Sequence, residues 1–112
     1  MSFAFAVRVV KLCQELTENE KEFVISKQLL ESATNAGAMV VRAEHAISEQ
    51  DFLNEITNAK KEINEAIYWL DLLKGANHIT PQCFDSISME AVELIEIIAP
   101  IIKKHQYQFG IN

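Results

Sequence analysis

The stretch SEQDFLNEITNAKKEINEAIYWLDLLKG, residues 48–75, contains a complete amphipathic helix with its start and stop signals. Ser48 followed by Asp51 is close to a capping box, in which the hydroxyl accepts a backbone N–H and the carboxylate reaches back. Gly75 stands where a left-handed residue ends many helices. Apolar side chains recur between them every three or four residues, at Phe52, Ile56, Ala59, Ile63, Ala66 or Ile67, and Leu70. This pattern predicts a long helix over residues 49–74.

Three other segments show helical periodicity, at residues 2–16, 22–46 and 81–104. Thr80 and Pro81 supply an N-cap and a first helical residue for the last of them. Pro100 is expected to kink or end that helix near residue 97, with a frayed tail in which Tyr107 and Phe109 can dock on a neighbour. The first segment has an expected core stripe of Phe3, Ala6, Val7, Val10, Cys13 and either Leu12 or Leu16.

Four amphipathic helices with short connections pack most simply as an all-α, antiparallel up-down-up-down four-helix bundle. A chain of 112 residues suits one domain, and only three glycines and two prolines argue against a turn-rich β protein. We therefore predict a single domain over residues 1–112. Gly37 lies inside the second helix, where glycine costs about 1 kcal/mol relative to alanine, so we expect it to have a packing role.

The net charge of −6 counts against binding of nucleic acid by the molecule as a whole. Cys13 and Cys83 lie far apart in sequence and form no CxxC motif, so we expect buried free thiols in a reducing cytosol. No apolar segment approaches the roughly 20 residues that a membrane span requires. The expectation is a cytoplasmic protein that does not enter the membrane.

The sequence contains no arrangement typical of catalysis. Helical bundles often hold two metal ions through Glu-x-x-His pairs, but no carboxylate stands three residues before His45, His78 or His105. Glu62 and Glu65 lie one turn apart, and a solvated charged face is a better reading than an acid/base pair. We expect no enzyme activity, no metal and no cofactor.

Tyr68 and Trp69 are the most distinctive pair in the sequence. Neighbouring residues point 100° apart on a helix, so both rings cannot enter the core while Ile63 and Leu70 hold the core stripe. One ring then fills the groove to an adjacent helix, or it anchors a subunit interface, where aromatic residues are enriched. The sequence leaves both readings open.

Five lysines are the candidates for a nucleic-acid-binding face: Lys60, Lys61, Lys74, Lys103 and Lys104. Four acidic residues are interleaved with these lysines: Glu62, Glu65, Asp71 and Glu96. No aromatic residues alternate with the lysines to form a stacking platform. A solvated face is therefore favoured over a phosphate-binding track.

Residues 25–73 resemble the bacterial four-helix-bundle proteins first noticed as open reading frames in intervening sequences of 23S ribosomal RNA genes. The matching positions are Ser26-Lys27-Gln28-Leu29-Leu30, Ser32, Thr34, Gly37-Ala38, Ala43, Ser48, Asp51-Phe52, Lys61-Glu62, Glu65 and Tyr68-Trp69-Leu70. The resemblance implies an up-down bundle without known catalysis and, in some branches, a ring-shaped homopentamer. One branch, the accessory protein of diversity-generating retroelements, is a basic bundle that binds nucleic acid and a reverse transcriptase.

This chain departs from that family at three positions. Glu31 replaces a usual arginine, Met39 a usual asparagine, and Arg42 a usual glutamate. Since Glu31 and Arg42 lie three turns apart on one helical face, we hypothesise that they keep a complementary pairing between helices or chains with reversed polarity.

Two functions are compatible with these features. The first is a homo-oligomeric scaffold or adaptor that binds a protein partner, a role that also suits a ribonucleoprotein, with Glu31, Arg42, Tyr68 and Trp69 at its interfaces. The alternative is a nucleic-acid-binding accessory protein that uses the lysine face.

Overall fold

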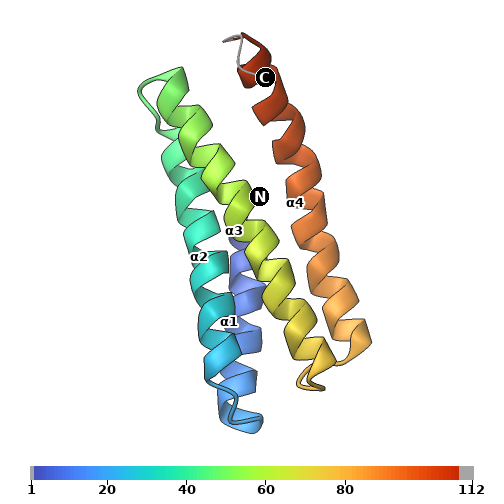
Figure 1. Ribbon diagram of the computed structural model, residues 1–112. Helices are drawn as coiled ribbons and strands as arrows, with labels where there is room; N and C mark the ends of the chain where they lie inside the picture. The colour runs from blue at the N-terminus through green and yellow to red at the C-terminus, as the bar shows by residue number, and fades with distance from the viewer. Residues whose placement is uncertain (1, 109–112) are drawn as a thin grey trace.

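The computed structural model describes the backbone of residues 2–108 and the side chains of residues 4–106. Its helices are α1 (Ser2–Asn19), α2 (Val24–Glu44), α3 (Glu49–Gly75) and α4 (Pro81–Gln108). Consecutive helices run antiparallel and lie side by side, as Figure 1 shows. The predicted all-α up-down-up-down bundle is therefore confirmed, in a molecule of 48 × 22 × 20 Å.

One apolar stripe from each helix forms the core. In α3 the predicted positions Ile56, Ile63 and Leu70 are buried, and Phe52 is partly buried against the core. In α1 the prediction was correct for Leu12, Cys13 and Leu16, which are buried, and the Phe3 side chain lies outside the described residues. At the start of α1 it was wrong, because Phe5 and Val9 are buried while three predicted positions are only partly buried: Ala6, Val7 and Val10. Almost every residue at the start of α1 is apolar, so the helical period alone fits more than one stripe.

Two predicted helix caps are present. The Ser48 hydroxyl accepts a hydrogen bond from the Asp51 N–H at 3.0 Å, and the Thr80 hydroxyl accepts one from the Cys83 N–H at the same distance. Each cap satisfies a backbone donor that has no partner inside its helix. These bonds fix the starts of α3 and α4.

The left-handed residue after α3 is Asn77, with φ 66°, and not Gly75, which is the last helical residue. The His78 N–H donates to the Leu73 carbonyl at 2.9 Å, and the Asn77 N–H donates to the Lys74 carbonyl at 3.0 Å. This pair of bonds is the Schellman motif. Asparagine is the residue other than glycine that most readily adopts the left-handed conformation, so the left-handed position lies two residues later than we expected.

The other helix ends also differ from the prediction. α1 continues to Asn19, beyond the predicted residue 16, and the Thr17 hydroxyl donates to the Gln14 carbonyl within the helix. α2 begins at Val24 and ends at Glu44, inside the predicted limits of 22 and 46. α4 continues through Pro100, which removes a single backbone bond, and the expected frayed tail is helical to Gln108. The Tyr107 side chain and Phe109 lie outside the described residues.

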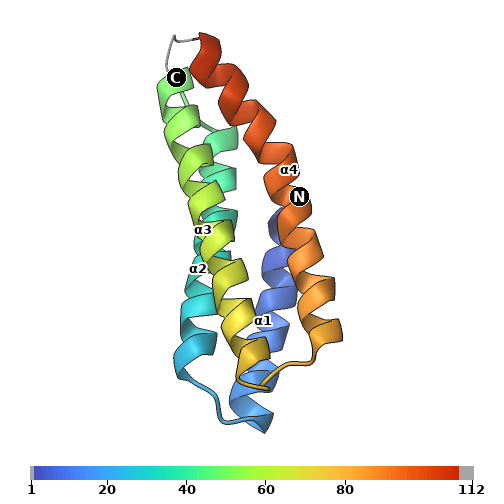
Figure 2. The same ribbon diagram turned by 45° about the vertical axis from the view of Figure 1, so that its right-hand side comes forward.

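α1 is much shorter than α3 and α4, with 18 residues against 27 and 28. In Figures 1 and 2 it lies beside only the lower part of the bundle, and α2, α3 and α4 alone form the upper part. Arg8 ties α1 to α4, since its guanidinium bonds the Glu90 carboxylate at 2.6 Å and the Ser86 hydroxyl at 2.9 Å. None of the described helices combines the length and the apolar character that crossing a membrane requires.

Candidate functional site

Tyr68 and Trp69 divide their roles as the helical geometry requires. Tyr68 is 56% exposed, whereas Trp69 is partly buried and packs against the hydrophobic core. The two rings form a T-shaped pair with centroids 4.9 Å apart and an interplanar angle of 65°. Leu72, one turn after Tyr68, is 37% exposed. We call these three residues the aromatic face of α3.

The indole N–H of Trp69 is buried and has no hydrogen-bond acceptor among the described residues. Buried indole N–H groups usually have a hydrogen-bond acceptor. A buried donor without one loses its hydrogen bonds to water and gains none from the protein, which destabilises the fold. The aromatic face therefore combines the exposed apolar area of Tyr68 and Leu72 with the buried, unsatisfied N–H donor of Trp69.

Three carboxylates lie close to one another on α2 and α3. Burial raises the pKa of Glu62, and the charges of Glu65 and Glu31 raise it further, against the effect of a hydrogen bond from Asn35. Within the described part of the chain, none of the three carboxylates forms an ion pair. The charges of Glu65 and Glu31 thus act unfavourably on the ionised form of Glu62 in the monomer.

Glu31 and Arg42 do not meet each other within the chain. Arg42 donates from Nε to the Glu55 carboxylate of α3 at 2.8 Å, so it already has a partner on the neighbouring helix. Glu31 faces the Glu62 carboxylate, a group of its own sign. A pairing between subunits with reversed polarity therefore stays a prediction, and in the monomer only Glu31 is free to take part in it.

The five predicted lysines are spread over the molecule. Lys74 lies at one end of α3, where it pairs with Asp71 at 3.5 Å and sits 4.0 Å above the Phe84 ring. Lys103 and Lys104 are exposed near the far end of α4, and Lys60 and Lys61 lie midway along α3. The bundle therefore presents these charges in three separate places.

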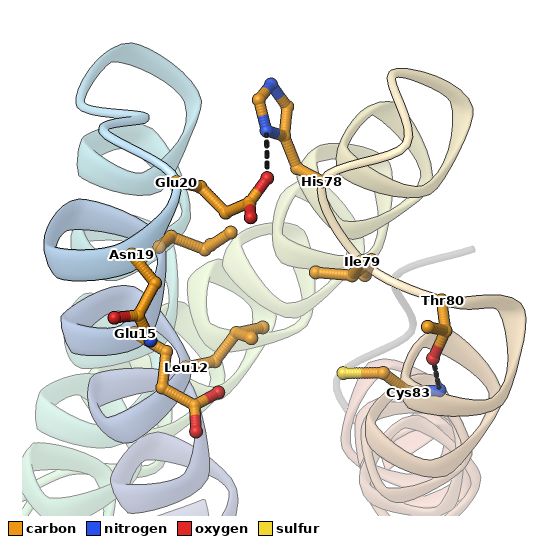
Figure 3. Close-up of a pocket in the computed structure, with 9 residues that line it drawn as sticks. Leu12, Glu15, Asn19, Glu20, His78, Ile79, Thr80 and Cys83 are labelled. Atoms are coloured by element: carbon orange, nitrogen blue, oxygen red, sulfur yellow. Dashed lines mark hydrogen bonds and ion pairs between the residues drawn. The ribbon is translucent and has the colours of Figure 1, made fainter.

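A pocket of about 250 Å³ lies between the C-terminal end of α1 and the start of α4 (Figure 3). Leu12 and Leu16 of α1 and Ile79 of the α3–α4 loop give it an apolar wall, and all three are buried. Glu15 and Glu20 supply carboxylates to the same pocket. Sequence reasoning did not find this pocket, because its residues come from segments more than 50 positions apart.

The remaining polar groups of the pocket are Asn19, His78, Thr80 and Cys83. The His78 ring lies 3.4 Å from the Glu20 carboxylate, and in Figure 3 the Cys83 sulfur points toward α1. Burial raises the pKa of the Cys83 thiol, with Arg8 opposing the effect and Glu15 adding to it. The thiol therefore remains largely protonated near neutral pH and is a weak nucleophile and metal ligand.

Both cysteines are free thiols, as predicted, but only Cys13 is fully buried. Each histidine also occupies a structural position: His45 follows the end of α2, His78 faces Glu20, and His105 stacks near Phe52 at 4.9 Å. Across residues 2–108, no three His, Cys, Asp or Glu side chains are grouped in a way that would hold a metal ion.

The sequence did not reveal the cluster of polar groups at the start of α2. The Glu22 carboxylate accepts hydrogen bonds from the N–H groups of Val24, Ile25 and Ser26 at 2.7–3.0 Å and so caps α2. Burial alone would raise the pKa of this carboxyl, but the three backbone donors together lower it. Beside it the Cys13 thiol donates to the Ser26 carbonyl, and burial, helped by Glu22, raises the pKa of Cys13 to about 11.

The comparisons with known proteins agree with this architecture. No curated protein matches the chain. A crystal structure of a protein with unknown function from the S23 ribosomal protein family of Bacteroides thetaiotaomicron VPI-5482 is similar, with 44% identity and a TM-score of 0.89. The similarity covers 91% of this chain and 94% of that one. The family described as 23S rRNA-intervening sequence protein matches residues 1–100. The chain therefore belongs to the 23S rRNA-intervening sequence protein family.

Proposed function

We propose that this chain is a homo-oligomeric helical-bundle scaffold or adaptor that binds a protein partner and performs no chemistry of its own. The aromatic face of α3 supports the proposal most directly. Tyr68 and Leu72 expose apolar area that contributes nothing to the monomer core, and Trp69 holds a buried donor without an acceptor. Aromatic residues in such positions are the usual anchors of protein interfaces.

The unpaired carboxylates beside the aromatic face fit the same proposal. Glu31 and Glu65 each repel the ionised Glu62 in the monomer, so a subunit or partner that brings positive charge to this side relieves the repulsion. In the family that the sequence resembles, some branches form rings of five subunits, and a ring requires two different surfaces of each subunit to meet. The side of α2 and α3 would be one of these surfaces.

Light scattering of the purified protein tests the proposal. We expect the wild-type mass to be at least twice 12.7 kDa, and the double variant Tyr68→Ala, Leu72→Ala to have the monomer mass. Ile47→Ala is the matched control, because Ile47 is 96% exposed and lies in the α2–α3 connection away from the aromatic face. A wild-type monomer at high concentration, or an assembled double variant, would refute this interface.

Titration with RNA and DNA across a range of salt concentrations separates the scaffold from the nucleic-acid-binding alternative. Binding through lysine–phosphate contacts weakens steeply as salt rises, with a slope that follows the number of contacts. The alternative predicts that removing Lys103 and Lys104 reduces this slope. The scaffold proposal predicts no saturable binding at physiological salt.

A further inference from the structure

The pocket between α1 and α4 has an apolar wall and two acidic ends. In Figure 3 the side chains of Leu12 and Ile79 approach each other from opposite sides, and the Glu20 and Glu15 carboxylates lie toward the two ends of the gap. No lysine or arginine belongs to its lining. The pocket thus offers an apolar wall with two carboxylates beside it.

The size of the pocket limits what it can hold. Its volume of about 250 Å³ is below the roughly 300–1,000 Å³ typical of small-molecule and cofactor sites. Pockets that accept one anchoring side chain are common in protein interfaces, where a single long side chain fills a concavity on the partner. The volume therefore suits one side chain better than a nucleotide or a cofactor.

We propose that this pocket receives a lysine side chain from the surface of a partner protein. The four-carbon stem of lysine can lie along Leu12, Leu16 and Ile79, while its ammonium group reaches the carboxylate of Glu15 or Glu20. Lysine regularly buries its stem in this manner and keeps its charged end near water or a carboxylate. An aliphatic residue would leave the carboxylates uncompensated, and an acidic residue would be repelled.

The side chains at the rim support this choice of occupant. Glu15 already acts on the Cys83 thiol, which shows that its charge reaches into the pocket. The weak contact of Glu20 with His78, at 3.4 Å, leaves Glu20 47% exposed and free to accept a stronger donor. A charge-assisted bond from an ammonium to a carboxylate is about twice as strong as a neutral hydrogen bond.

This pocket is a second docking site, separate from the aromatic face of α3. Its residues lie on α1, in the α3–α4 loop and at the start of α4, so none of them is part of the interface proposed above. A failure of either proposal therefore leaves the other standing. If both hold, the aromatic face joins copies of the chain while the pocket captures a basic side chain of a different protein.

Nuclear magnetic resonance titration tests the proposal with N-acetyl-lysine-N-methylamide, a single lysine with blocked backbone ends. We expect saturable shifts of the Ile79 methyl and Cys83 amide signals, at a constant total salt concentration. The norleucine analogue has the same stem without the charge and should bind more weakly. Glu15→Gln and Glu20→Gln should each weaken binding of the lysine probe by about threefold, the effect of losing one partly exposed ion pair.

The matched control is Glu18→Gln, which removes the same charge from an exposed position of α1 outside the pocket. It should bind the lysine probe like the wild type. Equal binding of the lysine and norleucine probes, equal losses in Glu15→Gln and Glu18→Gln, or an absence of shifts at the pocket would each overturn the proposal. Circular dichroism of every variant verifies that the helices are intact.

Discussion

Glu22 shows how much one side chain contributes to the start of a helix. Phe23, the residue before α2, has no side-chain acceptor, so the first N–H groups of the helix need another partner. The Glu22 carboxylate accepts from three of them at once. A negative charge at this position also interacts favourably with the positive end of the helix dipole.

We expect Glu22→Gln to lower the free energy of unfolding at pH 7 by about 1 kcal/mol, the usual effect of a lost cap. The pKa of Glu22 is lower in the folded state than in the unfolded state, so its stabilising effect is present above the unfolded pKa. That effect is lost as the pH falls through the folded pKa. Urea unfolding should therefore show a difference between variant and wild type at pH 7 that shrinks in acid, while Glu18→Gln shows little difference at either pH.

Glu62 should have the opposite dependence on pH. Its pKa is raised by burial and by Glu65 and Glu31, so its ionised form opposes folding of the monomer. Glu62→Gln should increase the free energy of unfolding at neutral pH, and the gain should fade as acid protonates Glu62 in the wild type. Urea unfolding of a monomeric background, Tyr68→Ala with Leu72→Ala, measures the effect. A destabilised Glu62→Gln variant would contradict this reading of the three carboxylates.

At the scale of residues, the sequence predicted the caps that follow simple rules and missed two local ones, at Glu22 and Asn77. Ser48 and Thr80 precede helices with the expected hydroxyl, and both cap as predicted. Asn77 replaces Gly75 as the left-handed residue because α3 continues one position further and then closes with the bonds of its last turn. Glu22 carries no sequence motif that distinguishes it from the other acidic residues near it.

At the scale of elements, the quality of the prediction follows the contrast between polar and apolar positions. α3 alternates clearly between charged and apolar residues, so its limits were correct within one residue and its stripe was correct. The start of α1 has little polar contrast, and there the stripe was wrong. Tertiary packing buries Phe5 and Val9 there, while Val7 and Val10, which are as apolar as Val9, are only partly buried.

Gly37 illustrates a packing expectation that the structure weakens. The residue lies against α1, but a Cβ atom placed on it would be 3.9 Å from the Ala6 Cβ, an ordinary contact distance. We therefore expect Gly37→Ala to stabilise the fold by about 1 kcal/mol, since alanine has the higher helix propensity and fits the space. Gly37→Leu should destabilise it by pushing α1 away.

Thermal and urea unfolding measure both Gly37 variants. Ala38→Gly is the matched control, because Ala38 is exposed on the same helix and should lose stability from the propensity change alone. If Gly37→Ala is less stable than the wild type, the approach of α1 to α2 at this point is tighter than an alanine permits.

At the scale of the whole molecule, the sequence predicted the architecture because four amphipathic helices with short connections have few ways to bury their stripes. The sequence did not predict the pocket, and it left the roles of Tyr68 and Trp69 open. The pocket depends on how Ile79 and Glu20, distant in sequence, approach across the bundle end. The separation of Lys74 from Lys103 and Lys104 likewise follows from the antiparallel course of α3 and α4. The end of α3, with Lys74, lies beside the start of α4, and Lys103 and Lys104 lie near the other end of α4.

The charge distribution of the molecule supports the proposed protein partner more than the nucleic-acid alternative. Arg8, Arg42 and Lys74 are already paired with carboxylates of the same chain, while Glu31 and Glu65 are exposed and form no ion pair in the described structure. The surface that remains available is therefore mainly acidic, as the net charge of −6 indicates. Such a surface steers basic partners toward it and repels polyphosphates.

Trp69 is the only tryptophan of the chain, so its fluorescence reports directly on the aromatic face. We expect dilution to shift its emission to longer wavelength over the same concentration range in which light scattering shows subunits separating. Tyr68→Ala combined with Leu72→Ala should give an emission that does not change with concentration. If the mass changes on dilution while the emission of Trp69 stays constant, the subunits meet through a different surface. The claim that the aromatic face of α3 joins the subunits would then be wrong.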